Sequence, residues 1–116
     1  GIHGEPGVER GKLKTANEVA DELVRRIVED MPLGAGDRVA VLVNGLGSTT
    51  YMEQFIVYRR VAEKLKELNV QVHRSFVGEF VTSLEMGGCS VSILKLDDEL
   101  AEMIDHPVDT PMYVQN

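Results

Sequence analysis

The sequence contains no tryptophan, a single cysteine, and only three tyrosines and three phenylalanines. Because Cys89 has no partner within the chain, it cannot form an intramolecular disulfide, which fits a reducing compartment. No apolar run is long enough to span a bilayer, and the chain opens with neither the basic nor the apolar segment of a secretory signal. We therefore expect a cytoplasmic domain that has no membrane contact.

Basic residues are scarcer than acidic ones, with 12 Lys and Arg against 19 Asp and Glu and a net charge of −7. An acidic surface opposes nonspecific binding to nucleic acid. The chain has 116 residues, of which 43% are hydrophobic, as expected for one packed domain without room for a second core. It opens on Gly1 without an initiator Met, so we expect it to begin inside a longer polypeptide that completes its function.

Two capping boxes, at residues 15–18 and 50–53, predict the starts of two amphipathic helices. The first helix is expected to end before Pro32, and the second near Leu68 with Asn69 as its cap. Apolar residues at helical spacing predict the buried faces: Val19, Leu23, Ile27 and Met31 in the first helix, and Tyr51, Phe55, Tyr58, Ala62 and Leu65 in the second.

Three further segments are typical of strands. Residues 39–43 form a continuous β-branched apolar run, which indicates a strand buried on both faces. Residues 70–73 alternate in polarity and continue loosely to residue 81, with Gly78 as a bulge, until the glycines at 87–88 interrupt them. Residues 90–96 form the next strand.

The ends of the chain give weaker signals. Residues 1–12 are rich in Gly and Pro and predict a short strand end that leads into a loop. Asp97 or Asp98 is expected to cap a short last helix that ends at Pro107, and residues 108–116 are expected to wrap the surface. The order of elements predicts a layered α/β domain with a mixed β-sheet flanked by helices.

Residues 44–50 connect the buried strand to the second helix and contain two glycines and three hydroxyl residues. Backbone N–H groups at such a junction could receive a phosphate. The segment lacks the lysine of a Walker motif and the third glycine of a dinucleotide fingerprint. A capped strand-to-helix turn is therefore the favoured interpretation.

The remaining polar residues do not converge in sequence. His3, His73 and His106 are scattered and Cys89 has no nearby ligand, so no metal site is predicted. His73 and His106 are expected to be structural, and Cys89 a small core residue. The carboxylates near the last helix are expected to cap it or form its solvated face: Asp97, Asp98, Glu99 and Glu102.

His3 differs from the other histidines because small residues flank it. Glycines on both sides leave the faces of the imidazole approachable, and Gly4 lets backbone and ligand come close. Pro6 stiffens the loop, and Glu5 is placed to orient the ring through a hydrogen bond. His3 is therefore the candidate functional residue, with an ordinary loop histidine as the alternative.

The segment Gly1-Ile2-His3-Gly4-Glu5-Pro6-Gly7 resembles the signature of the dihydroxyacetone kinase substrate-binding subunit family. Further blocks resemble that family in the same order and spacing: residues 40–47, 58–60, 81–86, 94–100 and 107–111. The resemblance spans essentially residues 1–116 and corresponds to the second of two α/β domains. It implies that the N-terminal domain, with the general acid/base histidine and aspartate, lies outside this chain.

The resemblance implies that His3 attacks the carbonyl carbon of dihydroxyacetone and holds the substrate as a covalent hemiaminal, with support from Gly4 and Glu5. Such capture would reject glycerol, which has no carbonyl. The phosphoryl donor, ADP recharged by a phosphotransferase system or ATP, would sit with Mg on a separate subunit or domain. This chain would carry no cofactor or metal, would be inactive alone, and would belong to a homodimer formed through the full-length subunit.

Two other readings stay open. A regulatory paralogue would bind dihydroxyacetone or a transcription factor without kinase activity, and a structural domain would only mediate dimerisation. The sequence departs from the family pattern mildly, at Ser48 in place of the usual Ala and at Glu85 in place of a common Asp. Residues 82–86 could form either a subunit contact or a strand-to-turn junction.

Overall fold

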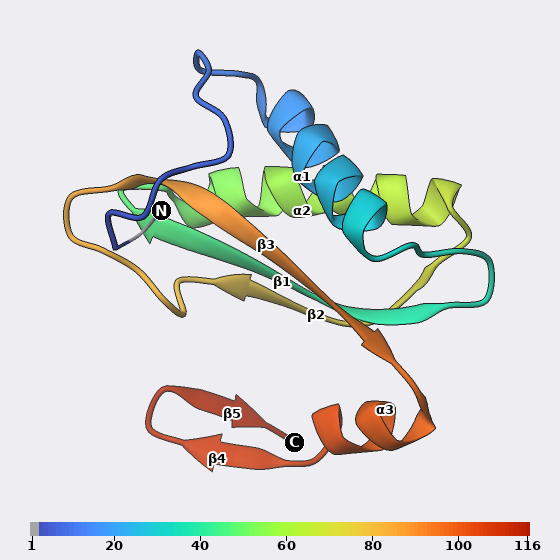
Figure 1. Ribbon diagram of the computed structural model, residues 1–116. Coiled ribbons are helices and arrows are strands. Elements are labelled where there is room, and N and C mark those ends of the chain that lie inside the picture. The colour runs from blue at the N-terminus through green and yellow to red at the C-terminus, as the bar shows by residue number, and fades with distance from the viewer. Residues whose placement is uncertain (1–2) are drawn as a thin grey trace.

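β1 (Arg38–Gly47) is the central strand of a three-stranded sheet. The computed structural model describes residues 3–116. β1 pairs in parallel with β2 (Gln71–Gly78) and antiparallel with β3 (Gly87–Leu96), in the order β2-β1-β3 (Figure 1). The mixed sheet and the α/β class expected from the sequence are confirmed.

Two helices, α1 (Ala16–Asp30) and α2 (Tyr51–Glu67), cover one face of the sheet (Figure 1). The alternation of β1 sends Val39, Val41 and Val43 toward these helices, and each is 0% exposed. The same buried cluster contains Ala20, Val24, Leu33, Val57, Val61, Leu65 and Val70. Removal of this row of branched side chains from water is the main force that holds the two layers together.

The helix boundaries follow the sequence signals closely. Both capping boxes form, since the hydroxyls of Thr15 and Thr50 each accept a backbone N–H from a glutamate that bonds back to the threonine. Met31 is the C-cap of α1, just before Pro32. Asn69 follows α2 with a φ of 57°, the left-handed conformation that commonly ends a helix.

The buried face of α2 was predicted wrongly in part. Tyr51 and Phe55 were expected on this face, but they are 58% and 55% exposed. The buried residues of α2 are Gln54, Val57, Val61 and Leu65. Of the predicted residues, Leu65 lies in the core and Tyr58 packs against it partly buried, so the buried stripe is shifted only at the start of the helix.

The central strand is longer than its apolar run. It was predicted to end at Val43, but the pairing with β3 continues through Gly47, which lies opposite Gly87. Gly87 and Gly88 were predicted to interrupt a strand and are instead the first residues of β3. A Cβ on Gly87 would lie 3.1 Å from Ser48 Oγ, so the bare glycine backbone lets this end of β3 approach the segment after β1.

Two further predictions about strands are corrected. β2 ends at Gly78, so Phe80 and Val81 lie in the following loop, and Gly78 pairs regularly opposite Asn44. The irregularity lies at His73, where the register with β1 shifts by one residue. The strand end expected in residues 1–12 does not occur in residues 3–12, and residues 1–2 lie outside the described part.

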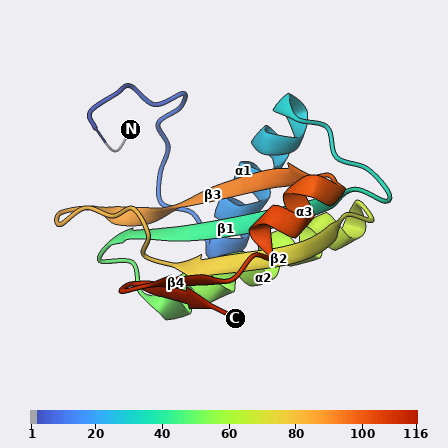
Figure 2. The same cartoon turned by 90° about the horizontal axis from the view of Figure 1, so that it is seen from below.

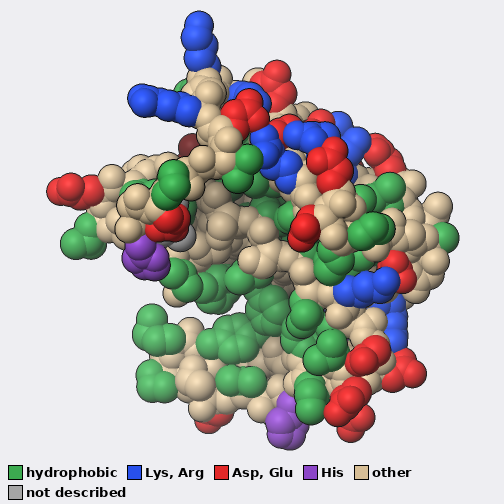
Figure 3. Space-filling view, in the orientation of Figure 1, with side chains coloured by type: hydrophobic (Ala, Val, Ile, Leu, Met, Phe, Trp, Pro, Cys, Tyr) green, Lys and Arg blue, Asp and Glu red, His purple; other side chains and the backbone are tan. Residues whose placement is uncertain are grey.

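The C-terminal segment covers part of the opposite face of the sheet (Figures 1 and 2). It consists of α3 (Asp98–Ile104) and a hairpin of β4 (Val108–Thr110) with β5 (Tyr113–Gln115). This hairpin was not predicted from the sequence, because three-residue strands are too short to show an alternating pattern. Gln115 is buried and its amide donates to the carbonyls of Ile104 and His106, both at 2.9 Å. Hydrophobic side chains line the gap between the sheet and this segment (Figure 3).

An ion-pair cluster ties the C-terminal segment to β2. Because β2 holds one extra residue at the register shift, the consecutive side chains of His73 and Arg74 both reach Asp105. His73 Nε2 lies 2.8 Å from Asp105 Oδ2, and Arg74 Nε donates to Asp105 Oδ1 at 2.9 Å. These hydrogen bonds, first from His73 and then from Arg74, lower the pKa of the Asp105 carboxyl.

Asp105 should therefore make the attachment of the C-terminal segment sensitive to acid. Because the pKa of Asp105 is lowered in the folded protein, its ionised carboxylate contributes fully to stability above the ordinary pKa of 3.8. This contribution is lost as the pH falls through the lower pKa of the folded state. We expect Asp105→Asn to speed amide hydrogen exchange in residues 98–115 at pH 7. In the unmodified protein, exchange corrected for intrinsic rates should become faster on acidification, and in the variant this increase should be smaller. The control is Asp98→Asn, which breaks the Asp98–Arg38 pair at the start of α3. Equal exchange in the two variants would contradict the prediction.

Candidate functional site

His3 lies on an exposed N-terminal arm, defined here as residues 3–14. The His3 backbone N–H donates to Glu5 Oε2 at 2.9 Å. Gly4 has a φ of 82°, and a Cβ placed there would meet nothing within 4 Å. The local geometry is therefore a tight turn in open space, held by a hydrogen bond between the backbone of His3 and the Glu5 carboxylate.

The arm and the carboxyl end of β1 are found at the same end of the molecule (Figures 1 and 2). Leu13 and Lys14 line a hollow of about 630 Å³ together with Gly87, Gly88 and Cys89 at the start of β3. The arm thus follows the β3 side of the sheet, as Figure 2 shows. The segments most relevant to His3 are therefore the turn after β1 and the loop before β3.

Asn44 fixes the loop of residues 79–86 to the end of β1. This side chain is only 3% exposed. Its Oδ1 accepts the backbone N–H groups of Phe80 and Val81 at 2.8 and 2.9 Å, and its Nδ2 donates to the Val81 carbonyl at 2.7 Å. Asn44 therefore uses three of its hydrogen-bonding positions on one loop and determines where that loop leaves β2.

Residues 82–86 then close over the turn between β1 and α2. Gly47 donates its N–H to Thr82 Oγ1 at 2.7 Å, and Ser48 donates its N–H to the Met86 carbonyl at 2.9 Å. Gly47 has a φ of 55°, and a Cβ there would lie 2.0 Å from the Met86 carbonyl oxygen. Residues 82–86 therefore form a junction that clamps the turn, which is one of the two roles left open by the sequence.

The turn of residues 44–50 has little capacity left for a phosphate. The N–H groups of Gly47 and Ser48 are already bonded to residues 82–86. The Thr49 N–H donates to the Leu46 carbonyl at 3.1 Å, and the Thr50 N–H donates to Glu53 Oε2 at 2.8 Å. The bonds from Thr50 lower the pKa of Glu53, so a negative charge persists at the helix start and repels anions. The structure supports the capped-turn interpretation.

Gln54 was not singled out by sequence reasoning, although it is a central polar residue of this region. It is 0% exposed, and its Nε2 donates to the Thr49 carbonyl at 3.1 Å. A Cβ on Gly45 would lie 1.9 Å from Gln54 Nε2, so Gly45 provides the space that the amide occupies. No sequence signal marked Gln54, because a glutamine in the first turn of a helix is ordinarily solvated.

Gly47 should tolerate substitution far less than a glycine in open space. We expect Gly47→Ala to lower the free energy of unfolding by more than about 2 kcal/mol, because the methyl group meets a backbone carbonyl at a positive φ. Gly34→Ala is the matched control, since a Cβ there meets nothing within 4 Å. Urea denaturation of the two variants measures the difference, and equal midpoints would contradict the clamp.

The other candidate residues are dispersed. Cys89 is half-buried against the core, and burial raises the pKa of its thiol. His73 is held by Asp105, and His106 is exposed at the end of α3. Asp97 caps α3 by accepting the Leu100 N–H at 2.8 Å, while Asp98, Glu99 and Glu102 are exposed. Residues 3–116 contain no cluster of His, Cys, Asp and Glu suited to a metal ion, and no helix among them is long and apolar enough to cross a membrane.

The sequence and the fold of this layered α/β domain were compared with those of known proteins. Residues 1–112 match the Dak1 domain. The chain therefore belongs to the Dak1 domain family.

Its relatives include a PTS-dependent dihydroxyacetone kinase 2, dihydroxyacetone-binding subunit, from Listeria innocua, which is 47% identical over 97% of this chain and 34% of the relative. An L-erythrulose 1-kinase from Mycolicibacterium smegmatis is 50% identical over 97% of this chain and 20% of the relative. A solved structure described as a dihydroxyacetone kinase operon co-activator is 32% identical, with a TM-score of 0.83 over 92% of this chain and 34% of that one. The chain thus spans about a third or a fifth of the length of the curated relatives it matches.

Proposed function

We propose that residues 1–116 are the second of two α/β domains in a dihydroxyacetone kinase subunit and that His3 captures the substrate covalently. The observation that carries the proposal is the open turn of His3 and Gly4 in a chain whose relatives include dihydroxyacetone and erythrulose kinases. The chain spans only about a third or a fifth of the length of those relatives, which supports the proposal that it is one part of a larger catalytic unit. The full subunit would act in the cytoplasm as a homodimer.

The capture step needs no cofactor on this chain. The unprotonated nitrogen of a neutral imidazole donates its electron pair to the carbonyl carbon, and the π pair of the C=O bond moves to oxygen. That oxygen gains a proton as the ring loses one from its other nitrogen, so the adduct is neutral and contains one new C–N bond. Glycerol offers no carbonyl carbon and is rejected although it is nearly the same size.

Capture also prepares phosphoryl transfer. A tethered triose presents its terminal hydroxyl in a fixed direction, which replaces a loose encounter by an oriented one. The nucleotide that donates the phosphoryl group, either ATP or a bound ADP recharged by a phosphotransferase system, would be held with Mg on a separate subunit or domain. The saturated turn of residues 44–50 supports this division, because the described N–H groups there bond within the chain.

Covalent capture should be visible by carbon NMR of the intact parent protein with dihydroxyacetone labelled at its carbonyl carbon. We expect a protein-bound tetrahedral carbon that is absent in His3→Ala. His106→Ala is the matched control, because His106 is also exposed but lies at the end of α3, and it should keep the signal. A carbon that stays ketone or free hydrate in the unmodified protein would reject the assignment.

Glu5 should act as a positioning residue for capture. Glu5→Ala removes the acceptor of the His3 backbone N–H. Loss of a hydrogen bond worth about 1 kcal/mol should lower the equilibrium constant for adduct formation roughly fivefold. Glu5→Gln retains an oxygen acceptor and should recover most of the loss. Titration of the tetrahedral carbon signal against dihydroxyacetone measures all three proteins; equal constants would show that Glu5 has no positioning role.

A regulatory role is the second candidate, favoured by the similarity to the operon co-activator. Such a protein would capture dihydroxyacetone without phosphorylating it. Turnover by the parent protein with its nucleotide-binding partner separates the two functions. Capture without turnover, in a parent that lacks the acid/base histidine and aspartate, would establish the regulatory role.

A further inference from the structure

The cations of this chain are paired unevenly. Eight form ion pairs with carboxylates: Arg25, Arg26, Arg38, Arg59, Arg60, Lys64, Arg74 and Lys95. Within residues 3–116, Arg10, Lys12 and Lys14 form none, and Lys66 in the last turn of α2 is the other such cation. Hydrogen bonds from Thr15 lower the pKa of the Glu18 carboxyl, and the charge of Lys14 adds to this effect without forming an ion pair. Three unpaired cations are therefore gathered on the arm that carries His3.

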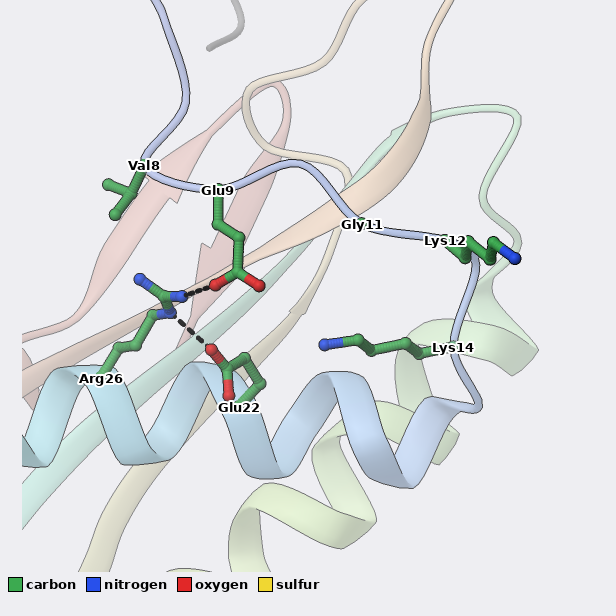
Figure 4. A pocket seen from close by; sticks show the side chains of 7 residues that line it. All are labelled: Val8, Glu9, Gly11, Lys12, Lys14, Glu22 and Arg26. Atoms are coloured by element: carbon green, nitrogen blue, oxygen red, sulfur yellow. Dashed lines mark hydrogen bonds and ion pairs between the residues drawn. The ribbon is translucent and has the colours of Figure 1, made fainter.

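The arm is anchored so that these cations face solvent. Arg26 of α1 binds Glu9 at 2.5 Å and Glu22 at 2.6 Å, which ties the middle of the arm to the helix (Figure 4). Lys12 points away from the hollow between the arm and α1, whereas Lys14 points along it (Figure 4). Arg26 thus neutralises the Glu9 carboxylate, while Arg10, Lys12 and Lys14 remain exposed on the arm.

Two exposed apolar side chains lie among the unpaired cations of the arm. Val8 is 92% exposed and Leu13 is 101% exposed. A leucine and a valine in full contact with water are poor ligands for a free phosphate but are suitable anchors for a protein surface. Their position beside Arg10, Lys12 and Lys14 indicates a protein partner with both an acidic and an apolar component.

We propose that residues 8–14 form a docking strip for an acidic face of the nucleotide-bearing protein that supplies the phosphoryl group. This inference rests on the proposed function, because it identifies where the second part of that kinase binds. Arg10 follows His3 by seven residues, so their Cα atoms are at most about 25 Å apart. A standard interface of about 800 Å² per partner is roughly 30 Å across, and one partner can therefore cover both the strip and the His3 loop.

The strip would act mainly on the rate of association. Exposed charges at the edge of an interface steer the encounter and contribute less to the lifetime of the complex. The rest of this chain is acidic, with a net charge of −7, so it would repel an acidic partner elsewhere and favour approach along the strip. Binding would thereby place the donor on the side of the molecule where the substrate is held.

Two charge reversals on the intact parent protein test the strip. Lys12→Glu and Lys66→Glu change the net charge by the same amount, and neither residue forms an ion pair that the substitution would break. Stopped-flow association with the ADP- and Mg-loaded nucleotide-binding subunit would be measured at about 20 mM and 500 mM salt. We expect Lys12→Glu to slow association roughly fivefold at low salt and little at high salt, with Lys66→Glu close to the unmodified protein.

The outcomes separate the strip from the proposed function. Equal slowing by both reversals would show an effect of net charge alone and would overturn the strip, while capture by His3 would stand. A large Lys12→Glu effect that persists at high salt would also overturn the electrostatic steering. Absence of any complex with the unmodified parent would reject both the strip and a donor held on a separate subunit, and the tetrahedral carbon signal would then report on capture by itself.

Discussion

The antiparallel pairing of β1 with β3 is the interaction on which the rest of the structure depends. It runs for ten residues, from Arg38 opposite Leu96 to Gly47 opposite Gly87. A ladder of this length carries the pairing of β1 four residues beyond the end of its apolar run, and so sets where the turn into α2 begins. The same ladder brings the loop before β3 next to that turn, where Thr82 and Met86 accept the N–H groups of Gly47 and Ser48.

The layers of this domain were largely predictable from sequence, whereas the long-range polar contacts were not. Capping boxes at Thr15 and Thr50 and the valine row of β1 are local signals, and they gave the helix starts and the central strand correctly. The continuation of β1 to Gly47 depends on pairing with residues about forty positions away, which no window of sequence contains. The buried face of α2 was misjudged in part because the helix turns Gln54, Val57 and Val61 toward the sheet, and apolar character alone does not determine this rotation.

The sequence indicates His3 as a candidate through its glycine-rich segment, and the role of His3 stays a prediction. The structure places His3 on an exposed arm whose turn Glu5 holds. Asn44 and Gln54 could not be recognised as supports of the neighbouring turn. The role of a buried amide becomes clear only from the groups that it bonds. Asn44 bonds backbone groups of the loop after β2, and Gln54 bonds the Thr49 carbonyl. Their roles follow from tertiary contacts.

The two regions near His3 differ in how firmly they are held: the turn after β1 is rigid, and the arm of residues 3–14 is open to solvent. The turn after β1 is saturated with internal hydrogen bonds, so its geometry is already determined before any ligand arrives. The arm is joined to α1 mainly through the Glu9–Arg26 pair, and its valine and leucine remain in water. Ordering such a segment costs conformational entropy. Any partner that covers the arm must offset this cost through the charged and apolar side chains that the arm leaves in water, whereas the turn after β1 needs no such compensation.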